Sequence, residues 1–147
     1  MTGGARRARS PAPPAPPASR RRVLLDTQVW LWWQADDRRL GPAARAVIAG
    51  GEVYFSAASA WEIAIKAGLG KLHLPATYDI GAELELDGFH QLPIDLVHAR
   101  AAGVLPLIHR DPFDRMLIAQ ARCEGLVLAT GNSEMSRYDV PVLAIDG

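Results

Sequence analysis

Short apolar runs alternate along this chain with segments in which apolar residues recur at helical spacing. The apolar runs predict strands at residues 23–25, 52–55, 90–94, 126–129 and 142–145. The intervening patterns predict helices at residues 29–33, 42–49, 60–67, 77–86, 95–102 and 112–124. Strands that alternate with helices are typical of a parallel sheet covered by helices on both faces. The pattern therefore predicts the α/β class, as a three-layer α/β/α sandwich with a mainly parallel central sheet.

Length and cysteine content narrow the class of protein further. The 147 residues suffice for one domain with a core, and no run of about 18 apolar residues predicts a membrane span. The single cysteine, Cys123, cannot form an internal disulfide or a cysteine-based zinc site. Its place in a helical pattern predicts a small buried hydrophobe in a reducing compartment. We therefore expect a cytoplasmic protein.

Charge is distributed unevenly, although the whole chain is formally neutral. Residues 1–22 hold six arginines, no acid and a cluster of five prolines, a composition that predicts a disordered or extended basic tail. The remaining residues hold ten lysines and arginines against sixteen acids, a formal charge of −6. This acidic balance argues against a plain cationic surface for nucleic acid. We expect a folded domain at 23–147.

Three acidic side chains recur at comparable places in the predicted α/β pattern. Asp26 ends the first predicted strand, Glu62 begins the helix after the second, and Asp114 lies in the first turn of the helix at 112–124. Functional side chains gather at the carboxyl ends of strands in parallel α/β sheets. We therefore expect the three carboxylates to converge, although 36 and 52 residues separate successive members.

Asp26 and Glu62 also have purely structural interpretations. Asp26 precedes a helix, where aspartate is a common N-cap. Ser59 and Glu62 have the S-x-x-E spacing of a capping box, and Lys66 follows Glu62 by four residues, in the favourable order for an ion pair. A cap and a surface ion pair would account for both acids without any chemistry.

The third acid stands in a segment with its own capping signal. Asp111 followed by Pro112 predicts an N-cap with proline at the first helical position. Asp114 then falls at the third helical position, where a carboxylate can bond back to the cap. Arg110 and Arg115 flank this segment; they could contact a nucleic-acid backbone, and Arg115 could equally pair with Asp111.

Five motifs occur in an order that is typical of one family. They are Leu24-Leu25-Asp26-Thr27, Ser56-Ala57-Ala58-Ser59-Ala60-Trp61-Glu62-Ile63, Gly70-Lys71-Leu72, His109-Arg110-Asp111-Pro112-Phe113-Asp114-Arg115 and Leu128-Ala129-Thr130. The set resembles PIN-domain ribonucleases of the VapC type, the toxins of toxin–antitoxin pairs. The motifs lie within residues 23–145, essentially all of the chain outside the basic tail.

The resemblance implies a set of site residues and a cofactor. The catalytic and metal-binding acids would be Asp26, Glu62 and Asp114, holding Mg²⁺ or Mn²⁺ for hydrolysis of RNA. The family often has a fourth acid, and here Asn132 occupies that place, where its amide oxygen could still bind a hard cation. Carboxylates suit this chemistry, because both ions prefer oxygen ligands and can activate water beside a phosphoryl group.

The resemblance also implies partners, and it leaves alternatives open. The expected partners are the RNA substrate and a small antitoxin protein, in a homodimer or a toxin–antitoxin hetero-oligomer. The alternative within the family is a non-catalytic PIN scaffold that binds RNA or an antitoxin without cleaving. A phosphatase of the haloacid-dehalogenase type also begins with a strand-end aspartate, but it needs a second aspartate where this chain has Gln28.

Overall fold

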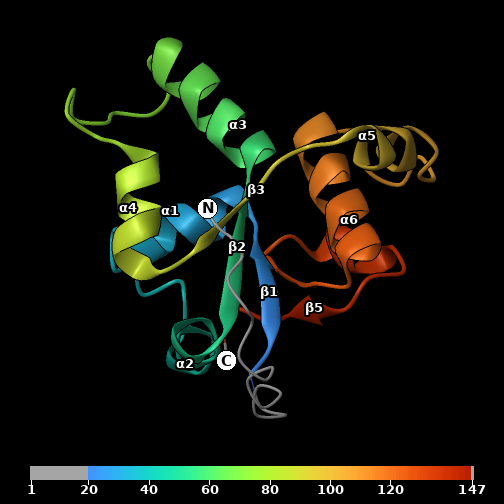
Figure 1. Cartoon of the computed structure of the whole chain (residues 1–147), viewed down its shortest axis with the longest axis horizontal. Helices are drawn as coiled ribbons and strands as arrows, with labels where there is room; N and C mark the ends of the chain where they lie inside the picture. The colour runs from blue at the N-terminus through green and yellow to red at the C-terminus, as the bar shows by residue number, and fades with distance from the viewer. Residues whose placement is uncertain (1–19, 147) are drawn as a thin grey trace, which may run out of the picture.

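Five parallel strands form one central sheet in the order β3-β2-β1-β4-β5 (Figure 1). The structure, a computed structural model, describes residues 20–146. The strands are β1 (Arg22–Leu25), β2 (Glu52–Ser56), β3 (His90–Leu92), β4 (Val127–Ala129) and β5 (Val142–Leu143). The predicted parallel sheet is therefore confirmed. Strand β3, whose predicted range of 90–94 includes a proline, lies at one edge of the sheet, where proline is tolerated.

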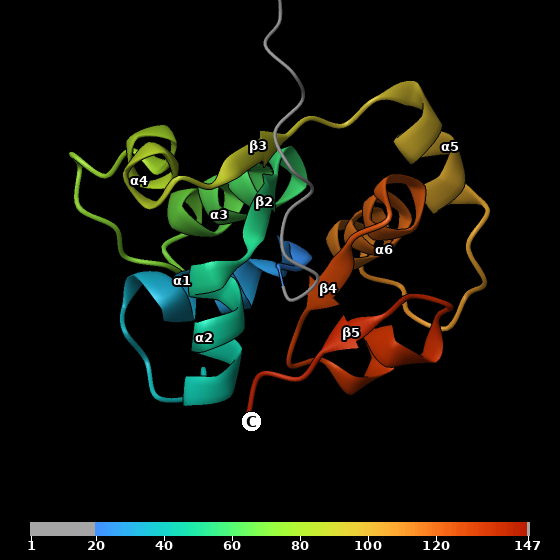
Figure 2. The same cartoon turned by 60° about the horizontal axis from the view of Figure 1, so that its bottom comes forward.

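Helices cover both faces of this sheet (Figure 2). They are α1 (Thr27–Gln34), α2 (Pro42–Gly50), α3 (Ala57–Gly68), α4 (Ile80–Asp87), α5 (Leu96–Gly103) and α6 (Pro112–Glu124), with a 3₁₀ helix, η1, at Ser133–Arg137. Helices α1 to α4 lie on one side, and α5, α6 and η1 lie on the other. The predicted three-layer sandwich is confirmed.

The alternation of side chains along the strands divides the core in two. Val23 and Leu25 of β1 face α1 to α4, while Leu24 between them faces α6, and all three are fully buried. Trp30 of α1 fills the first layer, with its ring centroid 5.0 Å from that of Phe55. A strand that is buried on both faces has a continuous run of apolar residues in its sequence, and residues 23–25 form such a run.

The start of α3 differs from the prediction. Ser56 is the N-cap, because its Oγ accepts the backbone N–H of Ala58 at 2.9 Å, so the predicted capping box of Ser59 and Glu62 is wrong. Both residues lie inside the helix and point into the protein. The S-x-x-E spacing gave the wrong cap because Ser56, at the end of β2, lies next to the unpaired backbone N–H groups of the first turn of α3.

Smaller corrections concern α4, Cys123 and the tail. Helix α4 begins at Ile80 with Asp79 as its cap, three residues later than predicted. Cys123 is exposed on α6, so its predicted burial is wrong. Most of the predicted tail, residues 1–19, lies outside the described residues, while Arg22 already belongs to β1 and bonds Glu52 at 3.0 Å. Within residues 20–146 no helix has the length and apolar character needed to cross a membrane.

The strand order places a site at the middle of the sheet. After β1 the chain builds β2 and β3 on one side, and it then crosses to β4 and β5 on the other. In open α/β sheets a crevice forms at the carboxyl ends of the two strands where this reversal occurs. Here those strands are β1 and β4, and the Asp26 amide just after β1 donates to Ala129 O at 3.0 Å.

Candidate active site

A cavity of about 330 Å³ opens at the carboxyl ends of β1 and β4. Asp26, Glu62 and Asp114 all border it, so the three acids predicted to converge are brought together. The other lining residues are Thr27, Gln28, Leu31, Trp32, Lys66, Asp111, Gly131 and Asn132. The acids come from three separate elements, the β1–α1 junction, α3 and α6.

Asp26 serves both as a helix cap and as a member of the cavity wall. Its Oδ1 accepts the backbone N–H of Gln28 at 3.1 Å, and its Oδ2 accepts the Thr130 hydroxyl at 2.5 Å. Only 8% of the residue is exposed. Burial raises the pKa of this carboxyl, against the hydrogen bonds from Thr130 and Gln28, and the charges of Glu62 and Asp111 raise it further.

Glu62 lies in the second turn of α3 and is also 8% exposed. Its Oε1 lies 2.7 Å from the Thr27 hydroxyl, which itself lies 2.8 Å from Ser59 Oγ. Because a carboxylate only accepts, Thr27 donates to Glu62 and Ser59 can donate to Thr27. The other oxygen of Glu62 contacts Lys66 Nζ at 2.9 Å, which confirms the predicted ion pair and raises the pKa of Lys66.

Asp111 and Asp114 divide the roles of cap and cavity acid on α6. Asp111 is the N-cap, with Oδ1 accepting the amides of Phe113 and Asp114 at 2.8 and 3.2 Å, as predicted. Asp114 instead contacts His109 Nε2 through Oδ2 at 2.6 Å. Burial raises the pKa of Asp114 to about 6, although the hydrogen bond to His109 acts in the opposite direction.

Arg115 does not take either role considered from the sequence. Its guanidinium donates to four backbone carbonyls, those of Ala102, Leu105, Pro106 and His109, at 2.9 to 3.3 Å. These carbonyls belong to the end of α5 and to the loop that leads to α6. Arg115 therefore holds this loop against α6, and among the described residues its guanidinium forms no ion pair with the Asp111 carboxylate.

Asn132 borders the cavity and also caps η1. Its Oδ1 accepts the backbone N–H of Glu134 at 2.9 Å, and its Nδ2 lies 3.5 Å from His109 Nε2. The amide is therefore close to the acids, with its oxygen already engaged by the cap. This agrees with the turn chemistry expected of asparagine and leaves its role toward a metal as a prediction.

Three polar residues of this site, Thr27, Thr130 and His109, are not among the predicted site residues. Thr27 and Thr130 each follow the carboxyl end of a strand, a position that could have indicated them, because those ends meet at one edge. His109 had no such signal, because it lies in a loop and reaches Asp114 only through the geometry of the turn before α6. The pKa of His109 is raised, chiefly by its hydrogen bond to Asp114.

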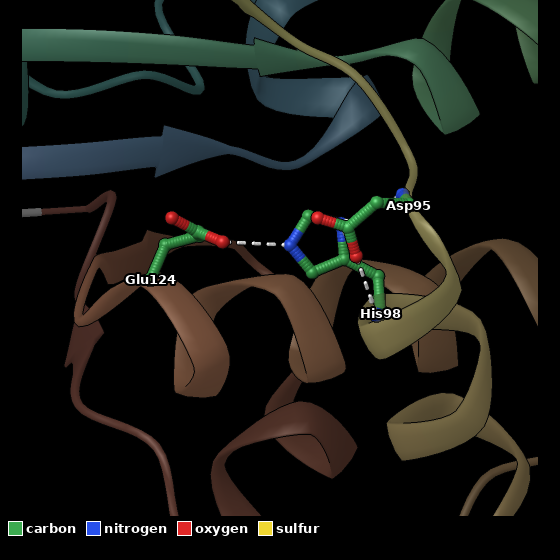
Figure 3. A group of neighbouring side chains, drawn as sticks. All are labelled: Asp95, His98 and Glu124. Atoms are coloured by element: carbon green, nitrogen blue, oxygen red, sulfur yellow. Dashed lines mark hydrogen bonds and ion pairs between the residues drawn. The ribbon is translucent and has the colours of Figure 1, made fainter.

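A second group of potential ligands lies away from the cavity (Figure 3). Asp95, His98 and Glu124 present atoms within 4.8 Å of one another. His98 Nδ1 accepts the Asp95 backbone N–H at 3.2 Å, so Nε2 carries the proton that bonds Glu124 at 2.8 Å. With both nitrogens engaged, this buried histidine closes a capping box and joins α5 to α6. His98 is structural.

The donors around the cavity fit a hard divalent cation. They include oxygens from four carboxylates and from the side-chain amides of Gln28 and Asn132, and Mg²⁺ and Mn²⁺ prefer such ligands. The raised pKa values of Asp26 and Asp114 have the direction expected of buried, mutually repelling carboxyls that a cation would neutralise. Lys66 provides the one cationic side chain of the cavity wall within the described residues.

Known protein structures resemble this chain in fold. A chain in the crystal structure of VapBC2 from Rickettsia felis, bound to a promoter DNA fragment, has 13% identity and a TM-score of 0.63 over 84% of this chain and 97% of that chain. A chain of a toxin–antitoxin complex from Klebsiella pneumoniae has 18% identity and a TM-score of 0.59, over 83% of this chain and 96% of that chain. A chain in the crystal structure of DNA-bound VapBC from Salmonella typhimurium has 18% identity and a TM-score of 0.60, over 84% of this chain and 97% of that chain.

The sequence itself carries the family assignment. No curated protein matches the chain. The family model described as PIN domain matches residues 23–141, which include β1 except Arg22, β2 to β4, α1 to α6 and every acid that lines the cavity. The chain therefore belongs to the PIN domain family.

Proposed function

We propose that this chain is an Mg²⁺- or Mn²⁺-dependent endoribonuclease that acts as the toxin of a toxin–antitoxin pair in the cytoplasm. One observation carries the proposal: Asp26, Glu62 and Asp114, from three separate elements, border one cavity at the switch point of a PIN domain. A shared cation explains acids gathered there from distant segments better than separate structural roles do, because of the three only Asp26 caps a helix.

Seven polar residues in or beside the cavity have roles in this proposal. Asp26, Glu62 and Asp114 would hold the ion, with Asn132 as a neutral fourth ligand. The bound ion would activate water and neutralise charge on the phosphoryl group. Thr130 and Thr27 hold one oxygen each of Asp26 and Glu62 in place. Lys66, paired with Glu62 in the cavity wall, would bind a phosphate oxygen of the RNA.

Metal-dependent cleavage of RNA by the purified protein tests the proposed activity. We expect a fluorogenic RNA to be cut when Mn²⁺ or Mg²⁺ is added and to remain intact in EDTA. Ca²⁺ at the same concentration serves as a matched control for ionic strength, because it binds oxygen ligands with a looser geometry. Mn²⁺-supported binding of RNA without cleavage would favour the alternative, a non-catalytic PIN scaffold, for which the neutral Asn132 is the supporting feature.

The partner proposed for this toxin is a small antitoxin protein, with RNA as the substrate. The support is the similarity to a chain of the toxin–antitoxin complex from Klebsiella pneumoniae, together with the acidic cavity. A partner that inserts an arginine or lysine would pair with these carboxylates and exclude the ion. We expect expression of this chain to arrest growth and co-expression of a small neighbouring open reading frame to restore it. Normal growth at high expression would contradict the proposed toxicity.

A further inference from the structure

The imidazole of His109 lies between two carboxylates at the edge of the cavity. Its Nε2 is 2.6 Å from Asp114 Oδ2, and its Nδ1 is 3.0 Å from Glu134 Oε1. The side chains of His109 and Asp114 are 16% and 15% exposed, whereas that of Glu134 is 51% exposed. A chain of contacts therefore runs from a solvent-exposed acid, through the ring, to a half-buried acid of the site.

Separate contacts hold this histidine and this glutamate in place. The backbone N–H of His109 donates to the buried Tyr138 hydroxyl at 2.8 Å, and the His109 carbonyl accepts from Arg115 at 3.3 Å. Glu134 lies in the first turn of η1, where the Asn132 side chain binds its amide. The backbones on either side of the ring are thus fixed by contacts other than the ring itself.

The contacts of His109 and Glu134 lie close to Asn132, the proposed fourth ligand. Asn132 is neutral and lines the cavity, whereas Glu134, two residues later, does not line the cavity and contacts His109 Nδ1. His109 engages Oδ2 of Asp114, and within residues 20–146 Asp114 Oδ1 has no hydrogen-bond partner, which leaves it free for a cation. Side chains that hydrogen-bond metal ligands orient them and raise their affinity for the ion.

We propose that His109 and Glu134 form a positioning pair, in which Glu134 orients the His109 ring and the ring holds the Asp114 carboxylate ready for the divalent cation. This inference rests on the proposed function, because it assigns a role toward the ion that the cavity acids would hold. Neither residue is a metal ligand in this arrangement, and Glu134 compensates, through His109, for the charge that Asn132 lacks.

Mn²⁺ affinity of the full chain, measured by isothermal titration calorimetry, tests the pair. His109→Ala should weaken the Mn²⁺ dissociation constant about 10- to 100-fold, the usual cost of losing such a partner. His109→Gln should recover part of this loss, because the amide can still donate to Asp114. Glu134→Gln should weaken binding by a smaller factor while leaving the melting temperature of the metal-free protein unchanged. His73→Gln and Glu85→Gln, at exposed positions, are the matched controls.

A double-mutant cycle separates relay through the ring from a direct effect of the glutamate charge. If Glu134 acts through His109, Glu134→Gln should have no further effect in the His109→Ala background, whereas a direct electrostatic effect would be the same in both backgrounds. The variants should also lower kcat for RNA with little change in KM, since the substrate contacts remain.

The possible failures of this inference can be told apart. Wild-type affinity in both His109→Ala and Glu134→Gln, or equal effects of Glu134→Gln in both backgrounds, overturns the positioning pair alone. A lower melting temperature with unchanged Mn²⁺ affinity also overturns it, because that result indicates a structural role. A parent protein that binds no Mn²⁺ overturns the proposed function together with this inference.

Discussion

Replacement of Asp26 by asparagine is expected to lower the rate of RNA cleavage at least 100-fold. Loss of partners that only orient metal ligands already costs about 10- to 100-fold, and Asp26 is proposed as a ligand itself. Asparagine keeps the shape and the oxygen that caps α1, so the fold should persist. The change removes the negative charge between Thr130 and the cavity. The measurement is kcat/KM on a fluorogenic RNA at saturating Mn²⁺.

Asp139→Asn is the matched control for this substitution. Asp139 is exposed and does not border the cavity, so its variant should cleave at the parental rate. Circular dichroism and melting temperature should show both variants folded. Cleavage by Asp26→Asn within about 3-fold of the parent would remove Asp26 from the proposed catalytic acids and leave it as a cap.

The metal-free protein is expected to lose stability as pH rises from about 4.5 to 7.5. Asp114 titrates at about 6 in the fold against an ordinary value of 3.8, so the folded state binds its proton more tightly than the unfolded state does. The free energy of unfolding therefore falls as pH rises from the ordinary pKa to the folded pKa of Asp114. The loss is up to about 3 kcal/mol, because each pKa unit corresponds to about 1.36 kcal/mol. The raised pKa of Asp26 acts in the same direction.

His109 should extend this loss to higher pH. Its pKa lies above the ordinary 6.5, chiefly because of Asp114, so the stability it contributes below pH 6.5 disappears as pH rises through its folded pKa. Asp114→Asn removes the Asp114 titration and the chief cause of the raised pKa of His109, so it should make the curve shallower, whereas Asp139→Asn should leave the curve unchanged. Urea unfolding in EDTA across this pH range is the measurement. A stability that rises from pH 4.5 to 7.5 would contradict the assigned pKa directions.

Several features of the fold and site could be predicted from local sequence. The apolar run at residues 23–25 becomes the central strand, because a strand buried on both faces needs no polar side. Asp111 and Gly125 mark the ends of α6 by capping and by a left-handed backbone, with φ of 68° at Gly125. The convergence of Asp26 with Glu62 was predictable because parallel strands end at one edge of a sheet.

Other features depended on contacts between distant segments. Ser56 rather than Ser59 caps α3, because the chain leaving β2 turns at Ser56 and packing carries Ser59 toward Thr27. Arg115 binds backbone carbonyls of a loop whose path no local pattern describes. The exposure of Cys123 follows from the face of α6 that packs on the sheet.

The amino-acid sequence by itself determined the order of strands and helices, the capping of α6 and the acids that meet at the sheet edge, because hydrophobic periodicity and backbone capping act over a few residues. The tertiary structure alone decided that His109 lies between Asp114 and Glu134. These three residues come from a loop, a helix and a 3₁₀ helix, and only the packing of α6 and η1 against the sheet brings them within hydrogen-bond distance.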